Sequence, residues 1–235
     1  MRRDYKRFLK GGENKKKAAA CNNVINYPLF KVPLCHVCPP YLHIVLGIVK
    51  KHHDMLDNEC HKLDKDIATY LAQTNQPVDK HTHFGKHVTK LRREKRNQSK
   101  PAGELKDGTG PVASNLDALL NKHRIVRKAY HGRSFVGNHC KKNLQPQVSG
   151  DMTSSVPKTA LQLVSHHEIL TKAEIIHQKL GQLFELFSTV DSLLSHDLPV
   201  AETTIPKTDK AISDYIKFFS QEFPWRKHAT KTTHF

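Results

Sequence analysis

Cysteine and histidine side chains are the groups in this sequence best suited to metal chemistry. Cys35 and Cys38 have the Cys-x-x-Cys spacing of zinc ligands. A second pair could come from four residues further along the chain: His52, His53, Cys60 and His61. A structural zinc site needs four ligands in a tetrahedral array, and these four residues do not form a second pair at a standard spacing. We therefore expect no cofactor, with zinc at Cys35 and Cys38 as the alternative.

The other patterns in the sequence that bear on metal binding or catalysis are a histidine cluster and the short motifs of known active sites. His81, His83 and His87 could chelate a metal if the chain curled there, but such clusters arise by chance among 17 histidines. No glycine cluster has the spacing of a phosphate-binding loop. Neither the Gly-x-Ser-x-Gly nucleophile elbow nor the His-Glu-x-x-His zinc motif occurs. We expect that the chain is not an enzyme.

The charge of the chain points to an anionic partner. There are 38 Lys and Arg against 22 Asp and Glu, a net charge of +16 at pH 7. Basic residues concentrate in segments 1–17, 86–100 and 118–142, and such patches attract phosphate backbones without reading base sequence. We expect DNA or RNA contacts from eight residues: Lys90, Arg92, Arg93, Lys95, Arg96, Arg124, Arg127 and Lys128. The alternative is that these runs are solvated helix faces or flexible linkers.

Several features bear on where the protein acts. The longest apolar stretch, residues 44–49, is far shorter than the ~20 residues of a membrane span. Five cysteines are a sparse, odd set, which favours a reducing compartment over a disulfide scaffold. Residues 91–96, LRREKR, fit a nuclear-import patch. We expect an intracellular protein without membrane contact, with import into the nucleus as one option.

Two long segments have the heptad spacing of helices that pair along an apolar seam. The first, residues 41–75, follows Pro39 and Pro40, which a helix start tolerates. The second is residues 158–194. The seam residues are Leu42, Leu46, Val49, Leu56, Leu63, Ile176, Leu180, Leu183 and Phe187. We predict a mainly α fold in which the two helices form a long antiparallel hairpin or bundle. The seams could instead pair between chains, as a self-associating coiled coil.

The remaining chain divides by composition. We predict a basic start and an extended, proline-rich arm over 1–40, a flexible basic linker over 76–112 with a short helix at 86–97, and a helical region over 113–224. Within that region, a helix from Ser114 through about Lys128, a loop at 145–157 and a third helix at 207–223 are expected. Residues 225–235 have no pattern that would fold alone and are predicted to be a disordered tail.

Three segments of the chain resemble a known group of proteins. They are Asp4–Asp64, with Asn22-Asn23-Val24-Ile25 and Val37-Cys38-Pro39-Pro40, then Tyr130–His139, and more weakly Tyr215–Pro224. Together they are similar to mobile-element (transposon)-derived, largely uncharacterised proteins that are abundant in cnidarian and other invertebrate genomes. The resemblance implies that this chain is an internal fragment of such a protein. It also implies that the acidic residues of a transposase-like nuclease lie outside the fragment, so that both long helices belong to a non-catalytic segment.

We therefore interpret the chain first as a truncated, non-catalytic, transposon-derived helical protein. A basic nucleic-acid-binding module and a coiled-coil interaction protein are the two alternatives.

Overall fold

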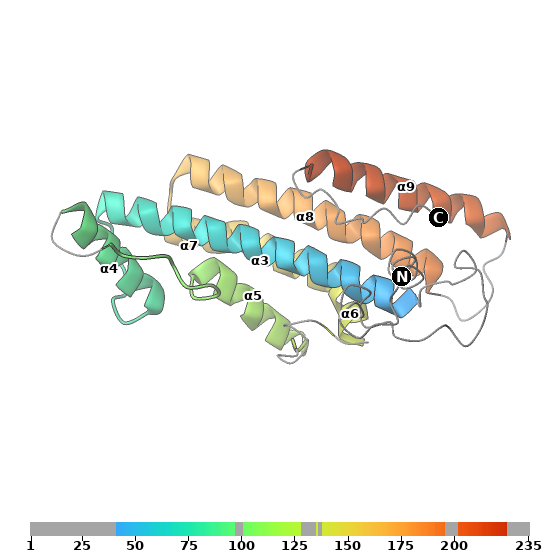
Figure 1. The fold of residues 1–235 in the computed structure, drawn as a ribbon, viewed down its shortest axis with the longest axis horizontal. Helices are drawn as coiled ribbons and strands as arrows, with labels where there is room; N and C mark the ends of the chain where they lie inside the picture. Colours follow the sequence, from blue (N-terminus) through green and yellow to red (C-terminus); the bar gives the residue numbers. More distant parts are fainter. Residues whose placement is uncertain (1–40, 97–100, 128–134, 136–137, 196–201, 225–235) are drawn as a thin grey trace, which may run out of the picture. The chain divides into compact units, whose positions relative to one another are not determined.

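Every regular element in the described part of the chain is a helix (Figure 1). The computed structural model describes residues 41–96, 101–127, 135, 138–195 and 202–224. The predicted mainly α class is confirmed for these residues. The predicted arm, the tail at 225–235 and the candidate zinc ligands Cys35 and Cys38 lie outside them.

The first long helix, α3, spans Tyr41–Thr74 and agrees with the prediction of residues 41–75. Its seam residues Val49, Leu56 and Leu63 are buried, and Leu46 is half-buried, whereas the side chain of Leu42 is not among those described. The helix ends where Asn75 takes a positive φ of 53°. Asparagine tolerates this left-handed conformation, which is common just after a helix C-terminus.

The second long helix differs from the prediction. Residues 145–157 are not a loop, and the helix predicted at 158–194 is two helices, α7 (Pro146–Leu163) and α8 (His167–Leu194). Helix α7 ends before Val164, whose backbone is extended at φ −145° and ψ 150°. Within α8, Leu180, Leu183 and Phe187 of the predicted seam are buried, and Ile176 is half-buried.

The polar composition of α7 explains why it resembled a loop. Pro146 stands in the first turn, where its missing N–H costs nothing. Buried Thr153 donates its hydroxyl hydrogen to the carbonyl oxygen of Ser149 at 3.0 Å, so that a polar residue is tolerated inside the bundle. The buried apolar face repeats every four residues through Val148, Met152 and Val156.

The three shorter helices agree with the prediction to different degrees. Helix α4, His83–Lys95, corresponds to the short helix predicted at 86–97 within the basic linker and begins three residues earlier. Helix α5 spans Pro111–Lys122 and stops short of Lys128 because Arg124 takes a positive φ of 55°. A short helix, α6, spans Asn138–Asn143.

The third predicted helix is present as α9, Ile205–Glu222, which follows a single 3-10 turn, Glu202–Thr204. It packs along α8. Lys179 forms an ion pair with Glu222 at 2.8 Å, and the ring of Phe187 lies 5.4 Å from that of Tyr215. These two contacts require α8 and α9 to run in opposite directions.

The predicted antiparallel pairing of long helices holds for α3 and α8. Lys172, near the start of α8, forms an ion pair with Asp66, near the end of α3, at 3.0 Å. At the other end of the pair, the rings of His52 and Phe184 meet edge to face at 5.4 Å. Figure 1 shows α3 between α8 and α5.

Helix α5 completes a ring of four antiparallel neighbours in the order α3, α5, α7 and α8. The carboxylate of Asp64 on α3 bonds to the start of α5. Asn115 donates to Thr159 at 2.9 Å, which joins the start of α5 to the end of α7, and α7 packs against α8. This is the up-down-up-down arrangement of a four-helix bundle.

Candidate nucleic-acid interface

Helix α4 carries four of the eight predicted contact residues, and a fifth, Arg96, is its C-cap. Its first turn is held by side-chain bonds. The Thr82 hydroxyl accepts a hydrogen bond from the Gly85 N–H at 2.9 Å and donates to the Asp79 carbonyl at 2.8 Å. A side chain at residue 85 would stand within 3.0 Å of that carbonyl, which explains the glycine. Phe84 and Val88 are buried and attach one face of α4 to the bundle.

Arg92 attaches the other end of α4. Its guanidinium donates to the carbonyl oxygen of Leu71 at 2.9 Å, in the last turn of α3, and also to the carbonyl of Gln76. A cation is favourable here because the C-terminal carbonyls of a helix have no partner within the helix. Arg92 was predicted to contact nucleic acid, but its guanidinium is already bonded inside the fold.

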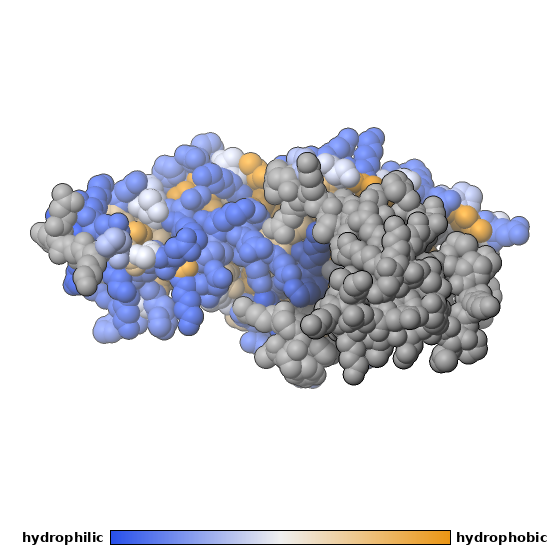
Figure 2. Space-filling model, in the orientation of Figure 1, coloured by the Kyte–Doolittle hydropathy of each residue, from blue (hydrophilic) through white to orange (hydrophobic). Residues whose placement is uncertain are grey.

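The outer face of α4 is a stripe of cations, which we call the α4 stripe: Lys86, Lys90 and Arg93. All three side chains are exposed. At 3.6 residues per turn they lie within an arc of about 60°, on the opposite side of the helix from Phe84 and Val88. None of the three forms an ion pair with any acid that the structure describes. Figure 2 shows mostly hydrophilic residues over this helix.

The surroundings of the α4 stripe add to its positive charge. Lys95 and Arg96, both predicted contacts, are exposed at the end of the helix. The nearby acid Glu94 accepts a hydrogen bond from the N–H of Ala102 at 3.0 Å. Sequence reasoning had omitted Lys86 from the contact residues, although its spacing of four residues from Lys90 would have revealed it.

The second predicted basic cluster has a different role. Arg124 is exposed, and Lys128 lies outside the described residues. The side chain of Arg127 is only 10% exposed, and its guanidinium bonds to Asp57 at 2.5 and 3.1 Å and to Asp117 at 3.1 Å. Arg127 therefore joins the chain after α5 to α3 and to α5.

Titration behaviour supports a structural role for this ion pair. Burial by itself would raise the pKa of Asp57, but hydrogen bonds from His53 and Arg127, together with their charges, hold the pKa well below 3.8. Burial lowers the pKa of His53, whose ring centroid lies 5.0 Å from that of Phe135 in a tilted arrangement. Asp57 is thus charged at pH 7, and burial favours the neutral form of His53.

A pocket of about 260 Å³ lies beside this ion pair, between α3 and α5. Its lining residues are Asp54, Asp57, Asn58, His61, Asp107, Gly108, Ala113, Asp117 and Arg127. Two of the carboxylates bond to basic side chains of the fold: Asp54 to Lys50 at 2.5 Å and Asp107 to His61 at 2.9 Å. Across the described residues, no group of three or more His, Cys, Asp or Glu side chains is placed to hold a metal ion.

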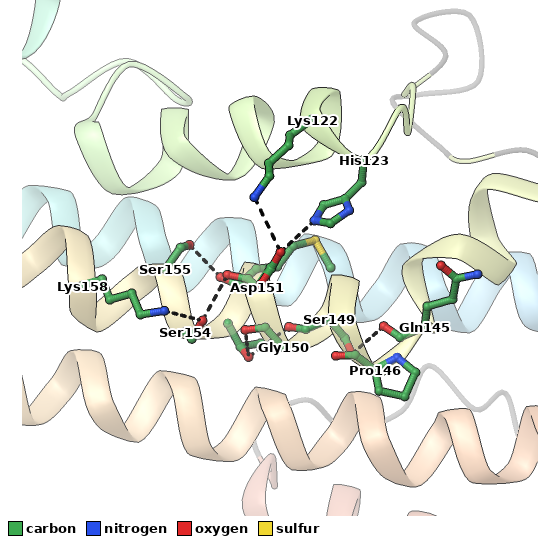
Figure 3. A network of polar contacts seen from close by, with 12 residues as sticks. Lys122, His123, Gln145, Pro146, Ser149, Gly150, Asp151, Ser154, Ser155 and Lys158 are labelled. Carbon is green, nitrogen blue, oxygen red and sulfur yellow. Dashed lines mark hydrogen bonds and ion pairs between the residues drawn. The ribbon is translucent and has the colours of Figure 1, made fainter.

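A histidine–carboxylate pair joins α5 to α7 (Figure 3). His123 Nε2 lies 3.0 Å from Asp151 Oδ2, and Lys122 Nζ lies 4.0 Å from the same oxygen. To act in catalysis, this pair would need a nucleophile hydrogen-bonded to the other ring nitrogen of His123. The hydroxyl of the nearby Ser154 instead donates to the backbone carbonyl of Asp151 at 3.4 Å. Lys122 stands in the last turn of α5, where its charge also complements the helix dipole.

Comparison of the chain with protein-family models, with curated proteins and with solved structures gives no match. Among the helices described, none is long and apolar enough to cross a bilayer.

Proposed function

We propose that this helical bundle binds nucleic acid, and that the α4 stripe makes the principal contacts to phosphates. The observation that carries the proposal is that Lys86, Lys90 and Arg93 share one exposed face of a helix whose opposite face is buried. Lysine and arginine presented in this way neutralise phosphates and release condensed counterions, which drives binding. Lys95, Arg96 and Arg124 are further exposed cations from the predicted set.

The hydrogen bonds that Arg92 and Arg127 make within the fold sharpen the proposal. Both guanidiniums bond to acceptors of the fold, so we assign them to holding the surface in place and not to binding phosphate. The basic residues of the predicted set thus divide into contacts and supports. The two classes can be told apart by experiment. Substituting a supporting residue changes folding stability, whereas substituting a contact residue changes the affinity for nucleic acid and its salt dependence.

The test is a titration of the full chain against a fluorescein-labelled 20-bp duplex over a series of salt concentrations. The Lys90→Gln/Arg93→Gln variant should bind at least tenfold more weakly at 0.1 M salt. The slope of log K against log salt should become shallower by about 1.8, because two phosphate contacts are lost. Unchanged affinity and slope would refute the proposal.

A matched control removes two charges elsewhere. Lys207 and Lys217 are exposed on α9 and form no ion pair with the described acids. Lys207→Gln/Lys217→Gln should leave affinity within about threefold of the parent chain. An equal loss in both variants would mean that only the net charge matters and that α4 has no special role.

We also propose that the chain lacks catalytic activity and derives from a mobile element, as the sequence resemblance implies. In support of the first point, carboxylates such as Asp57 and Asp151 are engaged by basic side chains of the fold. Incubation with plasmid DNA and Mg²⁺ or Mn²⁺ should produce no nicking above a protein-free control. Sequencing the genomic locus should find the reading frame continuing into acidic, transposase-like flanks, and an isolated gene would refute the origin.

A further inference from the structure

The ends of α4 are fixed to the bundle by independent bonds, which makes the helix a rigid support for its cations. The cap at Thr82 and the tight approach of Gly85 to Asp79 hold the first turn. Arg92 holds the other end through the carbonyls of Leu71 and Gln76. A cation on a pre-organised element loses little freedom when it binds.

The spacing of the α4 stripe is regular. Lys86 and Lys90 are four residues apart and Lys90 and Arg93 three, which places the three side chains along about 10 Å of helix axis. A duplex presents a dense and regular array of phosphates, with one charge per ~1.7 Å of its axis. A rigid row of cations fits a charge array that is itself rigid, whereas a single strand must first be ordered.

Outside the α4 stripe, the exposed side chains of α4 are His83, Glu94 and Lys95. Its phenylalanine ring, Phe84, is 8% exposed and belongs to the core, so that of the rings on α4 only the imidazoles of His83 and His87 reach the surface. The hydroxyl of Thr89, which lies beside the α4 stripe, donates to the carbonyl of Gly85 at 2.8 Å. Stacking of bases on exposed rings is what strengthens binding to single strands, and hydrogen bonds to base edges are what read a sequence. The α4 stripe presents Lys86, Lys90 and Arg93, whose charges bind phosphates of any sequence. Such side chains can also bond to guanine edges, which is why the test compares duplexes of unrelated sequence.

From these observations we infer that the α4 stripe takes double-stranded nucleic acid in preference to single strands, and binds its phosphate backbones without reading base sequence. This inference rests on the proposed function and names the ligand class. The shared chemistry is the paired sugar–phosphate backbone of a DNA or an RNA duplex, so both are included in the test.

The experiment compares the full chain with the Lys90→Gln/Arg93→Gln variant on three probes: a 20-bp DNA duplex, a 20-bp RNA duplex and a 20-nucleotide oligo(dT) strand. The difference between the two proteins isolates the contribution of α4 from that of other basic segments. The variant should lose at least tenfold in affinity for a duplex and less than threefold for oligo(dT). Two duplexes of unrelated sequence should bind within twofold of each other.

The outcomes separate the inference from the proposed function. An equal or larger loss on oligo(dT) overturns the duplex inference and leaves nucleic-acid binding by α4 intact. A strong dependence on duplex sequence overturns the claim of backbone recognition. No loss on any probe overturns the proposed function itself. A loss on only one duplex type supports the inference and identifies the backbone, DNA or RNA, that α4 prefers.

A folding control shows that any loss of affinity in the Lys90→Gln/Arg93→Gln variant comes from the two lost charges and not from unfolding. Both exchanged residues are exposed, so circular dichroism and the melting temperature of the variant should match those of the parent chain. As a complement, Arg92→Ala should lower stability because it removes the attachment of α4 to the end of α3. Its affinity for duplex should recover when the assay is run well below its melting temperature.

Discussion

The carboxylate of Asp64 on α3 caps the start of α5 and occupies the space that a side chain at Gly110 would need. Asp64 Oδ1 accepts from the Val112 N–H at 2.9 Å, and Oδ2 accepts from the Ala113 N–H at 3.0 Å. Pro111 has no N–H to satisfy. An N-cap is usually a side chain of the helix's own N-terminal residue. Here the capping side chain belongs to Asp64, which lies 48 positions before Val112 in the chain.

Gly110→Ala should therefore destabilise the fold. The φ of Gly110 is −77°, which alanine adopts without strain, so the backbone alone predicts a small gain in stability. A Cβ atom, however, would lie within 3.0 Å of the Asp64 side chain. We expect a loss of about 2 kcal/mol, measured by urea unfolding.

Gly150→Ala is the matched control for this prediction. Gly150 lies within α7, and a Cβ added there meets nothing within 4 Å. This change should be neutral or stabilising by up to about 1 kcal/mol. If Gly110→Ala proved as stable as Gly150→Ala, Asp64 would not be seated against residue 110.

The ion pair between Arg127 and Asp57 gives a second prediction. Arg127→Gln leaves two carboxylates without their cation and should cost about 2 kcal/mol, less than for a fully buried pair because Asp57 is 29% exposed. Arg124→Gln, three residues earlier and exposed, should change stability by no more than about 0.5 kcal/mol. Equal effects of the two changes on unfolding in urea would contradict the structural role of Arg127.

The same ion pair sets a dependence on acid. The pKa of Asp57 is lower in the folded chain than in the unfolded chain, so the stability from its charged form is complete above about pH 4. It is lost as the pH falls further and the carboxylate takes up a proton. The melting temperature of Asp57→Asn should accordingly fall less steeply below pH 4 than that of the parent chain.

His52 should cause a loss of stability at milder acidity. Burial, with a contribution from Lys51, lowers the pKa of His52 from 6.5 to about 3, and its Nε2 lies 2.9 Å from the Tyr215 hydroxyl. Because the folded pKa is the lower one, stability is complete above pH 6.5 and falls as the pH drops toward 3. We expect a loss of about 2–3 kcal/mol by pH 4.5 from this group.

His52→Phe removes this titration while keeping an aromatic ring against Phe184 and Phe187, whose rings lie 5.4 and 5.5 Å from that of His52. The variant should show a flatter profile of melting temperature between pH 6.5 and 4.5. A profile parallel to that of the parent chain would show that His52 is not held neutral in the folded state.

The packing of α8 gives a final prediction. Leu183 is 0% exposed, and an aspartate there would bury an unpaired charge. Leu183→Asp should abolish cooperative melting and most of the helical circular dichroism. Leu161→Asp, at a site that is 63% exposed on α7, should leave both within experimental error. If both variants melted like the parent chain, the assignment of the core would be wrong.

The helices that could be predicted were those with strong local signals. The heptad spacing of α3 between Leu46 and Leu63 is a property of consecutive residues, so its bounds were predicted to within one residue. Helix α7 was missed because Ser149 and Thr153 are loop-forming by composition. They are helical because the apolar face of the same segment packs into the bundle, where their hydroxyls are satisfied by carbonyls of the preceding turn.

For the candidate interface, the sequence by itself determined that the segment around Lys90 and Arg93 is basic and has the spacing of a helix face. It could not distinguish these residues from Arg92 or Arg127, which have the same chemistry. Only the tertiary structure decided that Arg92 meets the end of α3 and Arg127 meets Asp57. The physical reason is that charge and periodicity are local properties of the chain, whereas the partner of a charge is set by the packing of helices that lie far apart in sequence.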